Sequence, residues 1–122
     1  MQPLTLRAFD KQEKCILIIC GYELTKDGMV CVFGTLYNRF YKPDDIMILR
    51  SSGIIDAQGE ELFEWDTVYN QKLDFIGIVR FRNGSFICEG KDKVTTEWPP
   101  SSMIKRMDNF LLNPLALEAI VK

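Results

Sequence analysis

The 122-residue chain contains no histidine. Histidine is the side chain that ordinarily gains or loses a proton near neutral pH, so Ser-His-Asp catalysis, Cys-His catalysis and His-ligated zinc are excluded. A Walker-type phosphate loop and a Gly-x-Gly-x-x-Gly motif are also missing, so no pattern marks a nucleotide site. We therefore predict that the protein is not an enzyme, and we assign it no catalytic residue, cofactor or metal.

Long hydrophobic runs are missing as well. No stretch approaches the roughly 20 apolar residues of a membrane helix. The early run at residues 15–20 is short and follows charged residues, which is unlike a signal peptide. We expect a cytoplasmic protein without membrane contact. The cysteines form no Cys-x-x-Cys pair and are expected to be reduced, buried thiols; they are Cys15, Cys20, Cys31 and Cys88.

Charge of one sign is not in large excess. The chain has 15 basic and 17 acidic residues, a formal charge of -2, which gives no global attraction to nucleic acid or anionic membrane. Apolar residues make up 47% and charged residues 26%, as in ordinary globular proteins. The length allows one domain, residues 1–122, with an N-terminal part (1–50) and a C-terminal part (51–122).

Hydrophobic residues alternate with a period of two along most of the chain, which predicts short β-strands. The segment 14–20 is apolar on both faces, which favours a central strand. Asn83-Gly84 suits a two-residue type I′ turn, so residues 75–82 and 85–89 should form a hairpin. Further strands are expected at residues 4–9, 29–33, 35–41, 46–49 and 103–107.

One helix is expected at the C-terminal end. Asn113 is a good N-cap, Pro114 suits the first helical position, and residues 115–121 are compatible with a helix. Many short strands separated by turns favour a small barrel or sandwich, against which this helix would pack.

Several segments, taken in order, resemble the YopX family of bacteriophage and prophage proteins. They are LRAFDK at residues 6–11, ILRSSGIID at 48–56, GEELFEWDTV at 59–68, GIVRF with NGSF at 77–86, and NPL at 113–115. Trp65 stands where the family commonly has glycine, and the residues Phe110-Leu111-Leu112 replace its usual Gly-Asn-Ile-Tyr run. The resemblance implies an SH3-like β-barrel in the C-terminal half, whose core would include Val68, Val79, Phe81 and Phe86. It brings no established activity.

An acidic stretch at residues 56–66 has no basic residue; its acids are Asp56, Glu60, Glu61, Glu64 and Asp66. It could hold a divalent metal in an enzyme built on Asp56, Glu61 and Asp66, because carboxylates are hard oxygen ligands. It lacks the alternating ligands of a calcium loop, so we favour a structural role on a solvated face. For Asp66 the expected role is to cap the entry of a strand.

Tyr37, Arg39 and Tyr41 fall on one face of an expected strand. Aromatic residues interleaved with arginine can bind single-stranded nucleic acid, form a subunit interface, or stack within one subunit. Arg80 and Arg82, joined by Lys105 and Arg106, would form a second basic patch if their strands were neighbours, although a solvated face is the better interpretation.

Trp98 precedes two prolines in an irregular segment. It would anchor a partner or, in the interpretation that we favour, plug the end of the barrel.

Together these observations predict a mainly β phage or prophage accessory protein that acts by binding, as a homo-oligomer, in the bacterial cytoplasm. The possible contact residues are Tyr37, Arg39, Tyr41, Arg80, Arg82 and Trp98. The alternatives are a nucleic-acid-binding SH3-like module, for which support is weak, and a phage inhibitor of a host defence or regulatory protein.

Overall fold

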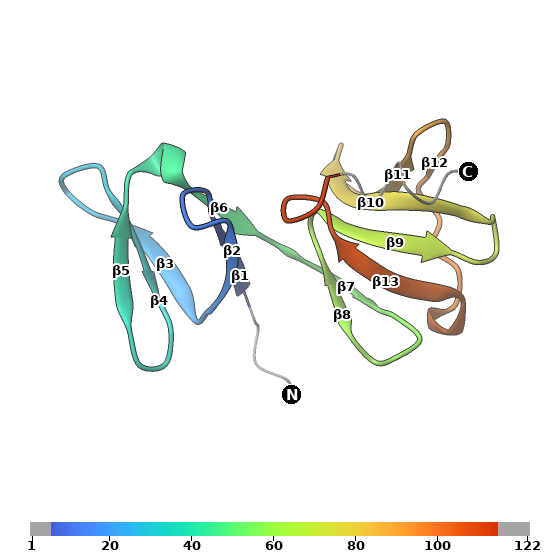
Figure 1. Cartoon of the computed structure of the whole chain (residues 1–122), viewed down its shortest axis with the longest axis horizontal. Coiled ribbons are helices and arrows are strands. Elements are labelled where there is room, and N and C mark those ends of the chain that lie inside the picture. Colours follow the sequence, from blue (N-terminus) through green and yellow to red (C-terminus); the bar gives the residue numbers. More distant parts are fainter. Residues whose placement is uncertain (1–5, 115–122) are drawn as a thin grey trace. The chain divides into compact units, whose positions relative to one another are not determined.

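A computed structural model describes residues 6–114, and these residues are mainly β (Figure 1). The strands are β1 (Leu6–Asp10), β2 (Cys15–Ile19), β3 (Gly21–Leu24), β4 (Val30–Phe33), β5 (Asn38–Tyr41), β6 (Ile46–Leu49), β7 (Ser51–Ile55), β8 (Glu61–Phe63), β9 (Asp66–Asn70), β10 (Phe75–Arg82), β11 (Ser85–Gly90), β12 (Val94–Thr95) and β13 (Ile104–Asn109). Two short 3₁₀ helices, η1 (Pro43–Asp45) and η2 (Ser101–Met103), interrupt them. In this described part, neither helix has the length or the apolar character needed to cross a bilayer.

The chain divides into two compact units, Met1–Arg50 and Ser51–Lys122. We call them the N-terminal unit and the C-terminal unit. In the N-terminal unit, two antiparallel sheets with the strand orders β2-β1-β6 and β3-β4-β5 contribute side chains to one core. Its buried members are Ala8, Ile19, Val30, Val32 and Ile46. Alternate side chains of β1, β2, β4 and β6 reach this core, as the period-two pattern predicts.

The prediction that residues 14–20 form a central strand is wrong. β1 is central in its sheet and β2 lies at the edge, pairing only with β1 among the described residues. Ile19 is buried at 2% exposure, whereas Ile18 on the opposite face is 67% exposed. Apolar residues on both faces of a strand therefore do not prove that both faces are buried. The face of β2 that carries Ile18 is exposed to solvent.

The C-terminal unit contains a five-stranded antiparallel sheet with the order β12-β11-β10-β9-β13 and the separate hairpin β7-β8. Leu62 from the hairpin shares a core with Val68, Val79 and Cys88 from the sheet. Phe86 packs against this core and its ring lies 4.8 Å from that of Phe81. These contacts join the hairpin to one face of the sheet.

The predicted SH3-like barrel is not confirmed, because the sheet does not close. β12 and β13 form its two ends, and the hairpin β7-β8 is tied to it by isolated backbone bonds instead of a ladder. One such bond runs from Ala57 N–H to Ile104 C=O at 2.8 Å. The expected helix at residues 115–121 lies outside the described residues, whereas Asn113 and Pro114 before it are exposed.

The predicted hairpin is confirmed. β10 and β11 pair from Gly77–Gly90 to Arg82–Ser85, and the two turn residues have positive φ angles, 53° at Asn83 and 81° at Gly84. Asparagine and glycine tolerate this left-handed conformation better than other residues do.

Candidate functional site

The predicted face of Tyr37, Arg39 and Tyr41 makes contacts within its own unit. The hydroxyl of Tyr37 donates to the carbonyl of Ile18 at 2.8 Å, and the guanidinium of Arg39 lies 5.6 Å from the centre of the Tyr37 ring. The hydroxyl of Tyr41 donates to Asp10 Oδ2 at 2.9 Å. Stacking within one subunit, one of the three interpretations of this face, therefore describes Tyr37, whereas Tyr41 is held by a hydrogen bond. Arg39 itself is exposed.

Asp10 is the buried acceptor at the centre of these contacts, with an exposure of 3%. Its Oδ1 accepts hydrogen bonds from the backbone N–H groups of Gln12 and Glu13, both at 3.0 Å. These bonds, above all that from Glu13, and the Tyr41 hydroxyl lower the pKa of Asp10 although burial opposes the shift. Burial, in turn, raises the pKa of Tyr41. The cluster stabilises the turn after β1.

The four basic residues of the second predicted patch do not lie on neighbouring strands. β9 separates the two strands that carry them, β10 and β13. The guanidinium of Arg80 lies 3.9 Å from the centre of the Trp65 ring, and Arg82 Nε pairs with Glu89 Oε2 at 2.9 Å. Arg106 faces acidic residues in the same unit, so only Lys105 has no such contact among residues 6–114.

Trp98 packs against the core of the C-terminal unit, and its Nε1 donates to the carbonyl of Phe86 at 3.0 Å. Its indole N–H, which would otherwise be costly to bury, is thereby satisfied. These contacts favour the plug over the partner anchor.

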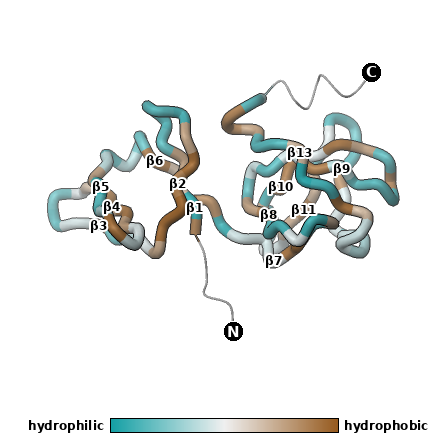
Figure 2. The backbone as a smooth tube through the Cα atoms, turned by 60° about the horizontal axis from the view of Figure 1, so that its bottom comes forward, coloured by the Kyte–Doolittle hydropathy of each residue, from teal (hydrophilic) through white to brown (hydrophobic). Residues whose placement is uncertain are grey.

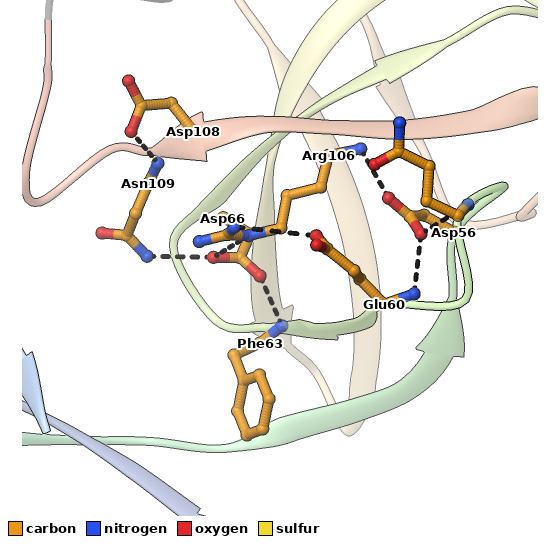
Figure 3. Close-up of polar contacts among 8 residues, drawn as sticks. Asp56, Glu60, Phe63, Asp66, Arg106, Asp108 and Asn109 are labelled. Carbon is orange, nitrogen blue, oxygen red and sulfur yellow. Dashed lines mark hydrogen bonds and ion pairs between the residues drawn. The ribbon is translucent and has the colours of Figure 1, made fainter. Parts of the chain in front are cut away.

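Two acids of the stretch, Asp56 and Asp66, are buried and not solvated as we expected for the stretch as a whole, whereas Glu60 is exposed. Asp56 is buried at 2% exposure. Its Oδ1 accepts from the N–H groups of Gln58 (2.9 Å) and Glu60 (2.8 Å), and its Oδ2 accepts from the N–H of Arg106 at 3.1 Å (Figure 3). Burial alone would raise the pKa of Asp56, but these three donors and the Arg106 charge outweigh it and lower the pKa.

Asp66, 1% exposed, caps the start of β9 as predicted. Its Oδ2 accepts from the N–H of Phe63 at 2.8 Å, and its Oδ1 accepts from Asn109 Nδ2 at 3.1 Å (Figure 3). Arg106 Nε lies 3.3 Å from Oδ1 without an aligned N–H, so this contact is an ion pair and not a hydrogen bond. The second oxygen partner of Arg106 is Glu60 Oε2 at 3.8 Å.

The carboxylates of Asp56 and Asp66 are therefore used by backbone and side-chain donors of the same unit. In the part of the chain that the structure describes, no three potential metal ligands among cysteine and acidic residues converge on one point. All four cysteines are free; Cys31 and Cys88 are buried as expected, whereas Cys20 is exposed. The acidic stretch and the arginine of β13 form a structural network.

Exposed apolar side chains that the sequence analysis missed lie on β2 and β3, residues 15–24. They are Ile18, Tyr22 (49%) and Leu24 (73%). β3 is the edge of its sheet, and its register places Tyr22 beside buried Val32 and Leu24 beside buried Val30. In Figure 2 the tube along β2 is brown, the colour of hydrophobic residues. We call residues 15–24 the β2–β3 edge.

A signal for the β2–β3 edge was present in the sequence. Residues 15–24 contain one charged side chain, Glu23, and no proline, although edge strands usually carry charges or proline that discourage pairing. Which side of a strand stays unpaired depends on distant segments, so the pattern alone could not identify an edge.

The fold is similar to that of a solved structure, the X-ray crystal structure of protein YopX from Bacillus subtilis. The TM-score is 0.62 at 14% sequence identity, and the match covers 95% of this chain and 97% of that chain. The resemblance to the YopX family is thereby confirmed at the level of the fold. No family model and no curated protein matches the sequence.

Proposed function

We propose that this chain, which shares the fold of YopX, is a binding protein that associates with a second copy of itself through the β2–β3 edge. The observation that carries the proposal is the open side of β3, where Tyr22 and Leu24 are exposed. A phage or prophage accessory role in the bacterial cytoplasm is part of the proposal and rests on the resemblance to the YopX family.

An open strand edge presents unpaired backbone N–H and C=O groups in a row, which is the template for adding another strand. On β2 the hydroxyl of Tyr37 already occupies the carbonyl of Ile18. Within residues 6–114, β3 pairs with β4 alone, so it is the better docking strand. A second copy brings an identical open strand. Across a two-fold axis, the backbone N–H and C=O groups of each β3 would pair with those of the other.

Apolar side chains would add to this backbone pairing. Exposed Leu24 and Tyr22 would lie against the same residues of the partner, where tyrosine is a common interface residue. Catalysis is not part of the proposal, because the chain has no histidine and the buried carboxylates Asp56 and Asp66 are engaged in structural hydrogen bonds.

Nucleic-acid binding receives less support. Arg82 is paired with Glu89, Arg80 stacks on Trp65, and Arg106 faces Asp66. These contacts compete with phosphate for the basic groups that the alternative requires.

Sedimentation velocity over a concentration series tests the proposal. The wild-type protein is expected to shift from monomer to dimer with concentration, whereas Leu24→Lys should raise the dissociation constant at least about tenfold, because an edge lysine discourages strand pairing. Leu73→Lys, at a residue that is 44% exposed in the C-terminal unit, is the matched control and should behave as wild type.

A wild-type protein that stays monomeric at high micromolar concentration would refute the proposal, as would a dimer unaffected by Leu24→Lys. If the wild type stays monomeric, the partner that pairs with the open edge would have to be a strand of a host or phage protein.

A further inference from the structure

The C-terminal unit has a half-open pocket of about 550 Å³ on its five-stranded sheet. Its floor comes from three adjacent strands, because the register places Tyr69 of β9 between Ile76 of β10 and Lys105 of β13. Met107, two residues further along β13, extends the apolar lining and is 40% exposed. A pocket of this size with a mainly apolar lining is typical of small-molecule sites.

The polar groups around the pocket are mostly cationic. Lys91 and Lys93, from the turn after β11, and Lys105 line it together with Asp74 and Asp92. Within residues 6–114, neither Lys91 nor Lys105 has an ion-pair partner. Two ammonium groups outside any ion pair, beside an apolar floor, fit a ligand that is apolar at one end and negative at the other.

Three lysines and two acidic residues, Asp74 and Asp92, line the pocket, so its lining keeps one net positive charge. Asp74 accepts a hydrogen bond from the hydroxyl of Tyr69 at 2.6 Å, and this bond raises the pKa of Tyr69. It also fixes the Tyr69 ring as a wall of the pocket. Lys93 lies 3.4 Å from the carbonyl of Leu73 and 5.9 Å from the centre of the Phe75 ring, so its charge stays at the pocket rim.

We propose that this pocket binds a small amphiphilic anion, an aromatic or aliphatic body that carries one carboxylate, sulfonate or phosphate group. The body lies on Tyr69, Ile76 and Met107, and the anionic group lies between Lys91 and Lys105. This site lies in the C-terminal unit and does not depend on the β2–β3 edge, so it can stand if self-association fails.

Fluorescence titration with 8-anilinonaphthalene-1-sulfonate tests the site, because this probe has an aromatic body and one negative group. Its uncharged analogue, N-phenyl-1-naphthylamine, lacks the sulfonate. We expect the anionic probe to bind wild-type protein more tightly than the neutral one. The double variant Lys91→Glu/Lys105→Glu should weaken the anionic probe about tenfold and leave the neutral probe within about twofold.

Lys11→Glu/Lys26→Glu is the matched control, because it makes the same charge change at two exposed lysines of the N-terminal unit. It should leave both probes unchanged. Met107→Tyr, which fills the pocket without adding charge, should weaken both probes. A thermal melt followed by tryptophan fluorescence without probe shows whether each variant keeps its fold.

Three results would overturn the proposal: no saturable binding of the anionic probe, equal binding of the neutral probe in wild type, or equal losses in the pocket and control double variants. The last result would mean that net charge, and not this pocket, attracts the probe.

Discussion

Replacing Asp66 with alanine removes the acceptor for two hydrogen bonds in the interior of the C-terminal unit. The N–H of Phe63 and the Nδ2 of Asn109 both lose their partner, and all three residues are at most 2% exposed. A buried donor left without an acceptor costs about 1–3 kcal/mol. Arg106 also loses an ion pair, but its side chain is 28% exposed and stays near Glu60, so it adds little.

The two orphaned donors together predict that Asp66→Ala lowers the free energy of unfolding by about 2–6 kcal/mol. Asp66→Asn should cost roughly half as much. The amide oxygen introduced by Asp66→Asn can still accept from the N–H of Phe63, but its NH₂ group would face the NH₂ group of Asn109. The amide of Asn109 cannot rotate to present its oxygen instead, because its Oδ1 accepts from the N–H of Leu111 at 2.9 Å.

Urea unfolding followed by tryptophan fluorescence measures this loss selectively. The chain has two tryptophans, Trp65 and Trp98, and both belong to the C-terminal unit, so the signal reports on that unit. Glu97→Ala, at an exposed residue, is the control and should stay within about 0.5 kcal/mol of wild type. An Asp66→Ala variant that loses less than about 1 kcal/mol would refute the structural role given to this carboxylate.

Two further predictions concern acid stability and thiol reactivity. The pKa of Asp56 is lower in the folded protein than in the unfolded chain. Its contribution to stability is therefore complete above the unfolded carboxyl pKa of about 3.9 and is lost as the pH falls through the folded pKa. Asp56→Asn should make the free energy of unfolding fall less steeply in acid, and an unchanged acid dependence would contradict this. Burial raises the pKa of the Cys88 thiol to about 12, so iodoacetamide at pH 8 should alkylate exposed Cys20 well before Cys88; equal rates by mass spectrometry would disprove the assignment.

The parts of the fold that the sequence predicted well are those set by neighbouring residues. The Asn83-Gly84 turn needs two positive φ angles, which these residue types supply by themselves, so the hairpin β10-β11 was predictable. The strand limits at Ile46–Leu49 likewise follow from Pro43 before it and the local apolar run.

The errors concern partners that are distant in sequence. Whether β2 is central depends on a partner beyond β1, and the described residues provide none. Asp56 was expected to be solvated because the sequence nearby is acidic, but it is buried and accepts from the N–H of Arg106 on the distant strand β13. A bulge between Arg106 and Asp108 shifts the register of β13 at that point, where the N–H of Arg106 is bonded to Asp56. No local sequence pattern predicts this contact between Asp56 and β13.

The two departures from the YopX pattern are linked in the structure. Trp65, where the family commonly has glycine, has a φ of 72°, a conformation that favours glycine and strains other residues. Phe110, from the second departure, stacks on Trp65 with ring centres 5.7 Å apart, and its N–H donates to the Trp65 carbonyl at 2.7 Å. The Arg80 guanidinium, 3.9 Å from the centre of the Trp65 ring, adds a cation–π contact. The contacts of the Trp65 ring with Phe110 and Arg80 offset the backbone strain that a glycine at position 65 would avoid. The two departures from the family pattern are therefore coupled. That change also occupies Arg80, which as a lone surface arginine would have been free to bind phosphate.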